Sequence, residues 1–207
     1  MNNLEKEGLE IIAKLMAVSA RTAPKTGGID HIHTKIVCFD EQNAIADMMC
    51  KIGENIFDNN PNKKRGEAIK ADWESDAGTI TNSGLLMLIG VEGRKVIGLN
   101  CGGCGFSTCA EMLKHPQLSI AEKSLPGPYC IFKVMDFSIA SASAVKTAME
   151  HNVDNRMMHK VGAAALKLGI LKPCDLIIGI PLSATGKNIY FDRVDKLEAW
   201  KIIKPNK

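Results

Sequence analysis

A glycine-rich run that carries three cysteines is the feature that most restricts how this chain can fold. Residues 100–112 read NCGGCGFSTCAEM, in which the cysteines are Cys101, Cys104 and Cys109. Glycines lie beside and between them, and glycine adopts backbone conformations that are closed to other residues. The segment can therefore curl around a small centre and point amide N–H groups at it. This composition is typical of a metal-binding loop.

Thiolate ligation is the chemistry that this spacing indicates. Soft metals prefer sulfur, and a four-iron cluster needs thiolates that converge on it from several directions. The next cysteine along the chain is Cys130, and twenty residues separate it from Cys109. We therefore predict that one [4Fe-4S] cluster is bound by Cys101, Cys104, Cys109 and Cys130, and that its chemistry is one-electron transfer.

Two other uses of these cysteines stay open at the level of sequence. A structural zinc ion would take the same four ligands, although the usual zinc pattern has two C-x2-C knuckles and the second is missing here. Cys101 and Cys104 would also suit a C-x-x-C redox pair, with Cys109 as a bystander. A disulfide framework is disfavoured, because no secretory leader precedes Leu4 and a chain of this size does not need such cross-links.

The composition indicates a soluble protein of the cytoplasm. A chain of 207 residues with 45% hydrophobic content can bury a full core, so we expect a single α+β domain over residues 1–207, with residues 100–130 as a cluster-binding segment inside it. A net charge of +3 is too small to indicate nucleic-acid binding. The longest apolar run, residues 85–91, is too short to cross a membrane. Seven cysteines without a leader suggest a reducing compartment.

Hydrophobic periodicity predicts a mixture of helices and strands. Helices are expected at residues 4–19, 40–56, 61–73, 110–113, 136–148 and 157–168. Strands are expected at residues 34–39, 129–134 and 175–181, together with a tight hairpin that joins residues 85–91 to residues 95–99. The second hairpin strand leads into Cys101, which would place the cysteine loop at the end of a strand.

A basic turn at residues 20–28 follows the first expected helix. Pro24 and a Gly-Gly pair end that helix, and Arg21 and Lys25 supply two cations. The turn could hold a phosphate group with Arg21 and Lys25 as its charge partners. As plain structure it is a loop with two exposed cations, and both interpretations stay open.

A second basic turn contains Gly186 and Lys187 after the last expected strand. A phosphate loop of nucleotide triphosphatases needs a glycine five residues before Gly186, and Pro181 stands there. That class of enzyme is therefore disfavoured. Lys187 and Ser183 could still bind a single phosphate or carboxylate.

The cysteine segment resembles a small four-iron cluster domain. Its pattern C-x2-C-G-x3-C, at residues 101–109, is similar to a segment in the large subunit of corrinoid iron–sulfur proteins, in which the fourth cysteine follows after a somewhat shorter gap. The whole chain resembles an uncharacterised prokaryotic family described as containing a ferredoxin-like domain. That resemblance extends over most of the chain, at residues 20–25, 101–112, 136–140, 153–157 and 180–193.

Parts of the chain also resemble flavin-dependent nitroreductases. The similarity lies in the helix end at residues 20–24, the small-residue helix at residues 138–148 and the segment at residues 168–182. It implies a nitroreductase-like sheet flanked by helices, with the cysteine-rich loop as an insert. It also implies a homodimer that binds FMN, with Arg21, Lys25 and Lys187 as contacts of the flavin phosphate.

Three functional hypotheses follow from these observations. The first is an iron–sulfur redox protein that exchanges electrons with a partner protein. The second is a flavin-dependent oxidoreductase fed by the cluster, for which no acid or base residue is identified. The third is a non-catalytic protein in which the metal holds the loop for a partner or acts as a sensor.

Overall fold

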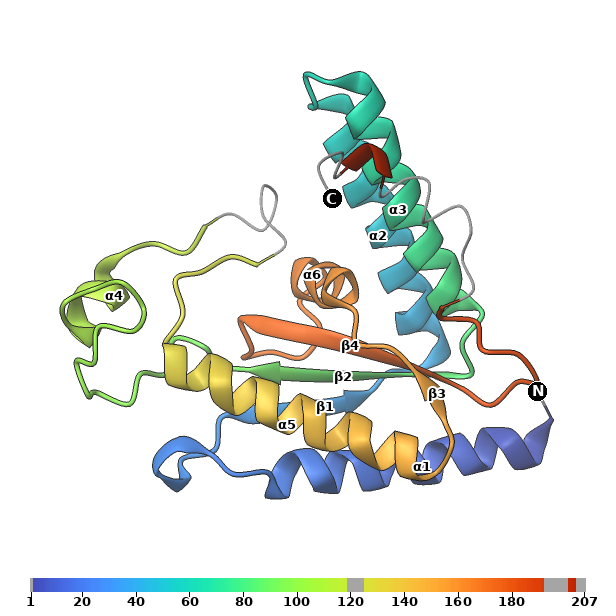
Figure 1. The fold of residues 1–207 in the computed structure, drawn as a ribbon, viewed down its shortest axis with the longest axis horizontal. Coiled ribbons are helices and arrows are strands. Elements are labelled where there is room, and N and C mark those ends of the chain that lie inside the picture. Colours follow the sequence, from blue (N-terminus) through green and yellow to red (C-terminus); the bar gives the residue numbers. More distant parts are fainter. Residues whose placement is uncertain (1, 119–124, 192–200, 204–207) are drawn as a thin grey trace.

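Four antiparallel strands form the sheet at the centre of the molecule. The computed structural model describes residues 2–118, 125–191 and 201–203 of the chain. The strands are β1 (Ile32–Ile36), β2 (Leu85–Val91), β3 (Asp154–Asn155) and β4 (Leu176–Ser183), and their order across the sheet is β1-β2-β4-β3 (Figure 1). Ile32 lies opposite Val91, and Leu85 lies opposite Leu182. Every pairing is antiparallel, and the chain passes through two helices, at residues 39–58 and 63–81, between β1 and its neighbour β2.

Helices cover both faces of this sheet (Figure 1). On one face lie α1 (Asn3–Thr22) and α5 (Ile131–Glu150), which pack against each other. On the other face lie α2 (Phe39–Asp58) and α6 (His159–Lys167), with α3 (Lys63–Thr81) packed along α2 as a helical hairpin. The fold is therefore a three-layer α+β arrangement.

The central strand β2 supplies side chains to two hydrophobic cores, one on each face of the sheet. All seven of its residues are buried. Its side chains alternate between the faces of the sheet, as a strand requires. Leu85, Met87, Ile89 and Val91 pack with α1 and α5, whereas Leu86 and Leu88 pack with α2 and α6. Burial of each such side chain stabilises the fold by roughly 1.5–3 kcal/mol.

Two glycines allow α6 to lie directly on β4. A Cβ atom at Gly162 would lie 1.7 Å from the carbonyl oxygen of Ile177. A Cβ atom at Gly179 would lie 2.1 Å from Cγ1 of Val161. Neither position has room for a side chain, so helix and strand approach each other as closely as their backbones permit.

Most of the elements expected from periodicity are present. The helices expected at residues 4–19, 40–56 and 157–168 correspond to α1, α2 and α6, and the strand at residues 175–181 corresponds to β4. The third helix is longer than expected, since α3 continues to Thr81. In the described part of the chain, no helix combines the length and the apolar content that crossing a bilayer requires.

Two expectations near the cysteines are wrong. Residues 95–99 form no strand, because β2 already pairs with β1 on one side and with β4 on the other. Residues 131–134 belong to the first turn of α5 and not to a strand. The cysteine loop is therefore an irregular segment, residues 92–108, between β2 and the short helix α4 (Cys109–Lys114).

Candidate functional site

Four cysteines line one small cavity at the amino-terminal end of α5. They are Cys101, Cys104, Cys109 and Cys130, the four residues expected as ligands. They come from three parts of the chain: the irregular segment 92–108, the first residue of α4, and the residue that precedes α5. The rest of the lining is Val96, Asn100, Gly102, Phe106, Thr108, Met112 and Ile131. The donors are therefore soft thiols in largely apolar surroundings, a set that suits an iron–sulfur cluster.

Glycines shape the loop around this cavity. Gly102 and Gly105 have φ values of +73° and +87°, which side-chain-bearing residues rarely adopt. The amide of Gly105 donates to the carbonyl of Gly102 at 2.9 Å, so a tight turn brings Cys101 and Cys104 to the same cavity. A Cβ atom at Gly103 would lie 2.8 Å from Cγ2 of Ile131, so this glycine lets the loop approach α5.

The start of α4 fixes the third cysteine. Thr108 caps the helix, and its hydroxyl accepts a hydrogen bond from the amide of Glu111 at 3.1 Å. The amide of Cys109 donates to Oδ1 of Asn100 at 2.9 Å. Because Asn100 precedes Cys101, this bond holds the first and third cysteines of the run in fixed relation.

Cys130 is the one buried cysteine among the four, with 5% of its surface exposed. It occupies the N-cap position of α5, a helix of 20 residues. The positive end of a helix dipole favours a negative charge, and a thiolate at a helix start gains this stabilisation. The N-cap position of Cys130 therefore suits a thiolate ligand.

The other three cysteines lie away from this cavity. Burial raises the pKa of the Cys174 thiol to about 12, and burial also raises the pKa of the Cys50 thiol. Cys38 is exposed and precedes α2. A thiol with a raised pKa is a poor nucleophile, and neither Cys174 nor Cys50 lines the cavity.

A single metal ion has no ready-made site in the described part of the chain. Among those residues, no three His, Cys, Asp or Glu side chains lie together in positions to bind one ion. The four cysteines do line a common cavity. A tetrahedral zinc ion would need all four sulfur atoms about 2.3 Å from one centre.

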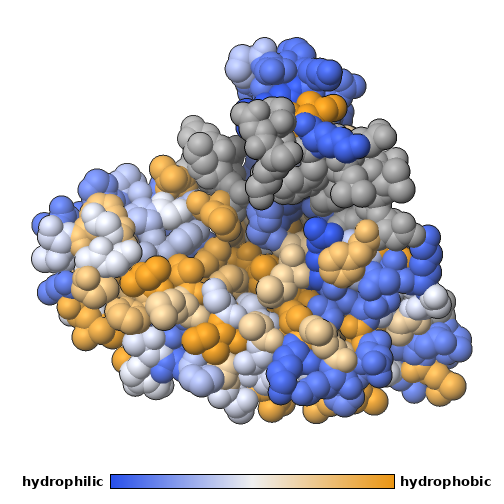
Figure 2. Space-filling model, viewed as in Figure 1, coloured by the Kyte–Doolittle hydropathy of each residue, from blue (hydrophilic) through white to orange (hydrophobic). Residues whose placement is uncertain are grey.

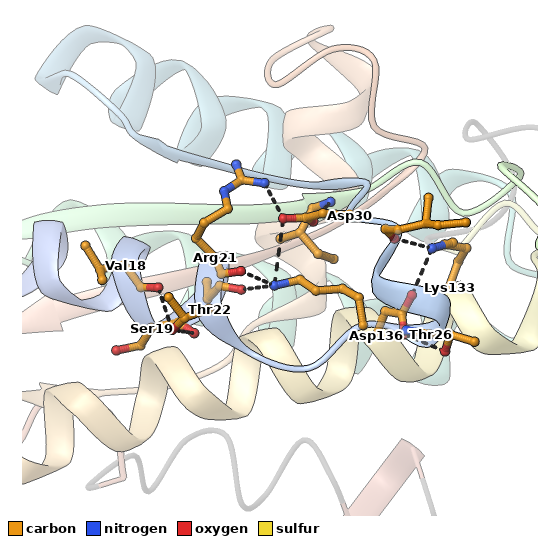
Figure 3. A network of polar contacts seen from close by, with 12 residues as sticks. Val18, Ser19, Arg21, Thr22, Thr26, Asp30, Lys133 and Asp136 are labelled. Carbon is orange, nitrogen blue, oxygen red and sulfur yellow. Dashed lines mark hydrogen bonds and ion pairs between the residues drawn. The ribbon is translucent and has the colours of Figure 1, made fainter.

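The basic turn after α1 uses its two cations differently (Figure 3). The Lys25 ammonium donates to the carbonyls of Ala20 at 2.7 Å and Arg21 at 2.5 Å, and only 4% of its side chain is exposed. Burial lowers the pKa of this ammonium group, which the carboxylate of Asp30 only partly offsets. Lys25 thus satisfies the last carbonyls of α1, and the expectation of two exposed cations is wrong for it. Arg21 pairs with Asp30 at 2.5 Å while 56% of its side chain remains exposed.

A buried ion pair joins this turn to α5 (Figure 3). The ammonium of Lys133 donates to the carbonyl of Ile29 at 2.8 Å and to Oδ2 of Asp136 at 2.9 Å. Oδ1 of Asp136 accepts hydrogen bonds from the amide and the hydroxyl of Thr26, both at 2.8 Å. Burial opposes the charge on Asp136, but these hydrogen bonds outweigh it and lower the pKa of the carboxyl.

Helix α5 connects the two candidate sites. Cys130 occupies its N-cap position, and Asp136 lies six residues further along the chain. At 1.5 Å per residue, about 9 Å of helix separates the cysteine cavity from the attachment of the basic turn. The sequence pattern predicts that this helix begins at residue 136, whereas α5 begins at Ile131 and Asp136 lies inside it, paired with Lys133. The signal of this pair was the spacing of Lys133 and Asp136, which places opposite charges on one face of a helix.

Lys187 lies far from Arg21 and Lys25. It belongs to the turn after β4, where Asn188 donates to Asp154 at 2.8 Å. Asp154 follows the carboxyl-terminal end of α5, whereas the basic turn is attached near the amino-terminal end of that helix (Figure 1). One chain therefore does not bring the three expected phosphate contacts together.

Comparison with known proteins places these features in a family. Residues 126–193, which include Cys130, match the family described as "Uncharacterized protein containing a ferredoxin domain (DUF2148)". A protein of Archaeoglobus fulgidus named "Uncharacterized protein" is 37% identical over 194 residues, which cover 94% of this chain and 96% of that protein.

Solved structures show the same fold at low sequence identity. A BluB-like flavoprotein from Clostridium difficile 630 superposes with a TM-score of 0.56 and 14% identity, covering 86% of this chain and 81% of that one. An FMN and NADPH-dependent nitroreductase from sphigopyxis sp. strain HMH superposes with a TM-score of 0.50 and 10% identity, covering 85% and 78%. The chain spans 60% and 59% of the length of two further matches, an oxidoreductase and a nitroreductase from Vibrio species. The chain has a nitroreductase-like α+β fold and belongs to the family described as "Uncharacterized protein containing a ferredoxin domain".

Proposed function

We propose that this protein is an iron–sulfur redox protein that binds one [4Fe-4S] cluster through Cys101, Cys104, Cys109 and Cys130. The observation that carries the proposal is that Cys130 lines the same cavity as three cysteines of residues 101–109, although twenty residues separate it from that run. The description of the family as containing a ferredoxin domain supports it.

The spacing of the cysteines favours a cluster over a single zinc ion, because the second C-x2-C knuckle of the usual zinc pattern is missing. In a four-iron cluster each thiolate binds a different iron, so the sulfur atoms need not meet at one point. The four cysteines share a cavity, as a cluster requires.

The residues around the cavity would have different roles in a redox site. When bound, the cluster supplies a one-electron couple. The apolar side chains of Val96, Phe106 and Met112 keep water from part of the site, and the glycine loop offers amide N–H groups to sulfur, both of which tune a reduction potential. Cys101 is exposed, so its side of the cavity is where a redox partner protein would dock.

A flavin-dependent oxidoreductase is the second candidate. The basic turn with the exposed Arg21 is attached to α5 about two helical turns beyond Cys130, so a flavin bound there would lie near the cluster. Lys25 would contribute to its phosphate only after leaving the carbonyls of α1. Lys187 would contribute only from a second copy of the chain, because it lies at the other end of α5.

A homodimer is the assembly that this second candidate needs. Apolar side chains are exposed on both helices of one face: Ile11, Leu15 and Val18 on α1, and Met135, Ile139 and Met149 on α5. Figure 2 shows apolar surface gathered over the first turns of α5. Light scattering during gel filtration tests this proposal, and a monomeric mass at micromolar concentration would argue against it.

Visible absorption of protein purified without oxygen separates these functions. We expect the spectrum of an iron–sulfur cluster, which is a broad absorption band that bleaches with dithionite. Such a cluster suits a protein of a reducing compartment such as the cytoplasm. Structured flavin bands, with FMN released on denaturation, would favour the second candidate. A colourless protein loaded with zinc would favour a structural or sensor role and contradict the proposal.

A further inference from the structure

The long gap between the third and fourth cysteines poses a structural problem. Twenty residues separate Cys109 from Cys130. The two side chains nevertheless line the same cavity. Bringing the ends of such a segment together costs conformational entropy, so specific contacts must hold them.

One side chain contacts both ends of this segment. The guanidinium group of Arg94 donates to the carbonyls of Leu113 and His115, each at 2.8 Å. It also donates to the carbonyl of Pro128 at 3.3 Å. Leu113 and His115 lie just after Cys109, and Pro128 lies two residues before Cys130. Arg94 thus joins the chain that leaves the third cysteine to the chain that arrives at the fourth.

The turn that carries Arg94 is itself fixed to the sheet. The amides of Gly93 and Arg94 donate to the two carboxylate oxygens of Asp175, at 2.6 Å and 3.2 Å. Asp175 precedes β4, and its amide donates to the last residue of β2. The hydroxyl of Tyr129 donates to the carbonyl of Asp175 at 3.0 Å. Asp175 therefore also holds the residue that directly precedes Cys130.

We propose that Arg94 is a positioning residue for the metal centre, which closes the segment between Cys109 and Cys130 and sets Cys130 against the other three cysteines. This inference rests on the proposed function. Arginine suits the task because its planar group carries five N–H donors in a fixed fork. Lysine keeps the charge, but its one ammonium nitrogen would have to replace two guanidinium nitrogens, of which Nη1 donates to Pro128 and Nη2 to Leu113 and His115.

Iron release from protein purified without oxygen tests the inference. The variants are Arg94→Ala and Arg94→Lys, with Lys95→Ala as a matched control, since Lys95 is an exposed cation of the same turn. Removing residues that support a metal site typically lowers metal affinity about 10–100-fold, so we expect Arg94→Ala to lose iron to a chelator faster than the wild type by about the same factor. The rate of iron loss from Arg94→Lys should lie between the rates of Arg94→Ala and the wild type. The rate for Lys95→Ala should equal that of the wild type.

A double variant shows whether Arg94 acts through Cys130. Adding Arg94→Ala to Cys130→Ser should release iron no faster than Cys130→Ser alone, because the ligand that Arg94 positions is already missing. Additive effects would overturn the inference, as would wild-type rates in Arg94→Ala. Equal loss of thermal stability in the metal-free forms of Arg94→Ala and Arg94→Lys, without selective iron loss, would show a general structural role and overturn it too. A wild type that binds no iron would instead refute the proposed function itself.

Discussion

The amide nitrogen of Cys130 lies 2.8 Å from the carbonyl oxygen of Gly93. This bond holds the start of α5 against the turn after β2. Cys130 thereby lies in the same cavity as the three cysteines of the glycine-rich loop and α4. The cavity is thus built where a strand end, a loop and a helix start meet. Rigid elements hold Cys130, whereas an irregular segment carries Cys101 and Cys104.

Replacing Cys130 by serine should lower the iron content without unfolding the protein. Each thiolate binds one iron of a four-iron cluster, so Cys130→Ser should retain about three iron atoms per chain or fewer. Cys50→Ser is the control, because Cys50 lies in α2 and does not line the cavity. Equal iron in the wild type and Cys130→Ser, with unchanged circular dichroism, would remove Cys130 from the ligand set.

Much of the fold and the first three cysteines could be predicted because their signals are local. The apolar stripe of α1 and the continuous apolar run of β4 show directly in the sequence. Cys101, Cys104 and Cys109 lie within nine residues, and the glycines between them predict the turns that bring them to one cavity.

The remaining errors come from contacts between distant segments. Residues 129–134 include aromatic and β-branched side chains and suggest a strand, but burial of Lys133 against Asp136 and the carbonyl of Ile29 requires a helix there. The supposed hairpin failed because β1 and β4, both far away in the sequence, take the two edges of β2. The burial of Lys25 was not predicted either, because it depends on the carbonyl groups of Ala20 and Arg21 at the end of α1.

The ion pair of Lys133 and Asp136 should be essential for stability. Asp136→Asn leaves the Lys133 ammonium buried without its counter-charge, and breaking a buried pair in this way costs about 3–5 kcal/mol of unfolding free energy. The control is Glu150→Gln in the exposed pair with Lys146, which should cost about 0.5 kcal/mol or less. Urea unfolding monitored by circular dichroism measures both. Similar costs for the two variants would contradict the role of the buried pair.

Acid should destabilise the protein through the same network. The pKa values of Asp136 and Asp30 are lowered in the folded state, so the unfolded state binds protons more readily. Their contribution is present above the unfolded-state pKa of about 3.9 and is lost as pH falls through the lower folded-state values. The unfolding free energy of the wild type should therefore fall below about pH 4 more steeply than that of Asp136→Asn. Parallel pH profiles from urea titrations would show that Asp136 does not contribute.

Gly162 should tolerate no side chain. A Cβ atom there would lie 1.7 Å from the backbone oxygen of Ile177, which cannot move without displacing β4. We expect Gly162→Ala to cost about 2 kcal/mol or more of unfolding free energy. Gly8→Ala in α1 meets no atom within 4 Å and should be neutral or stabilise the protein by up to about 1 kcal/mol. Thermal unfolding compares the two, and an unchanged midpoint for Gly162→Ala would contradict the packing of α6 on β4.

Analysis of iron, acid-labile sulfide and zinc in the wild type, purified without oxygen, tests the central claim most directly. The proposed cluster predicts about four iron atoms and four sulfides per chain, with little zinc. Both iron and sulfide should disappear when Cys101, Cys104 and Cys109 are replaced together. About one zinc ion per chain without sulfide, or no metal under strictly anaerobic conditions, would contradict a four-iron centre in this cavity.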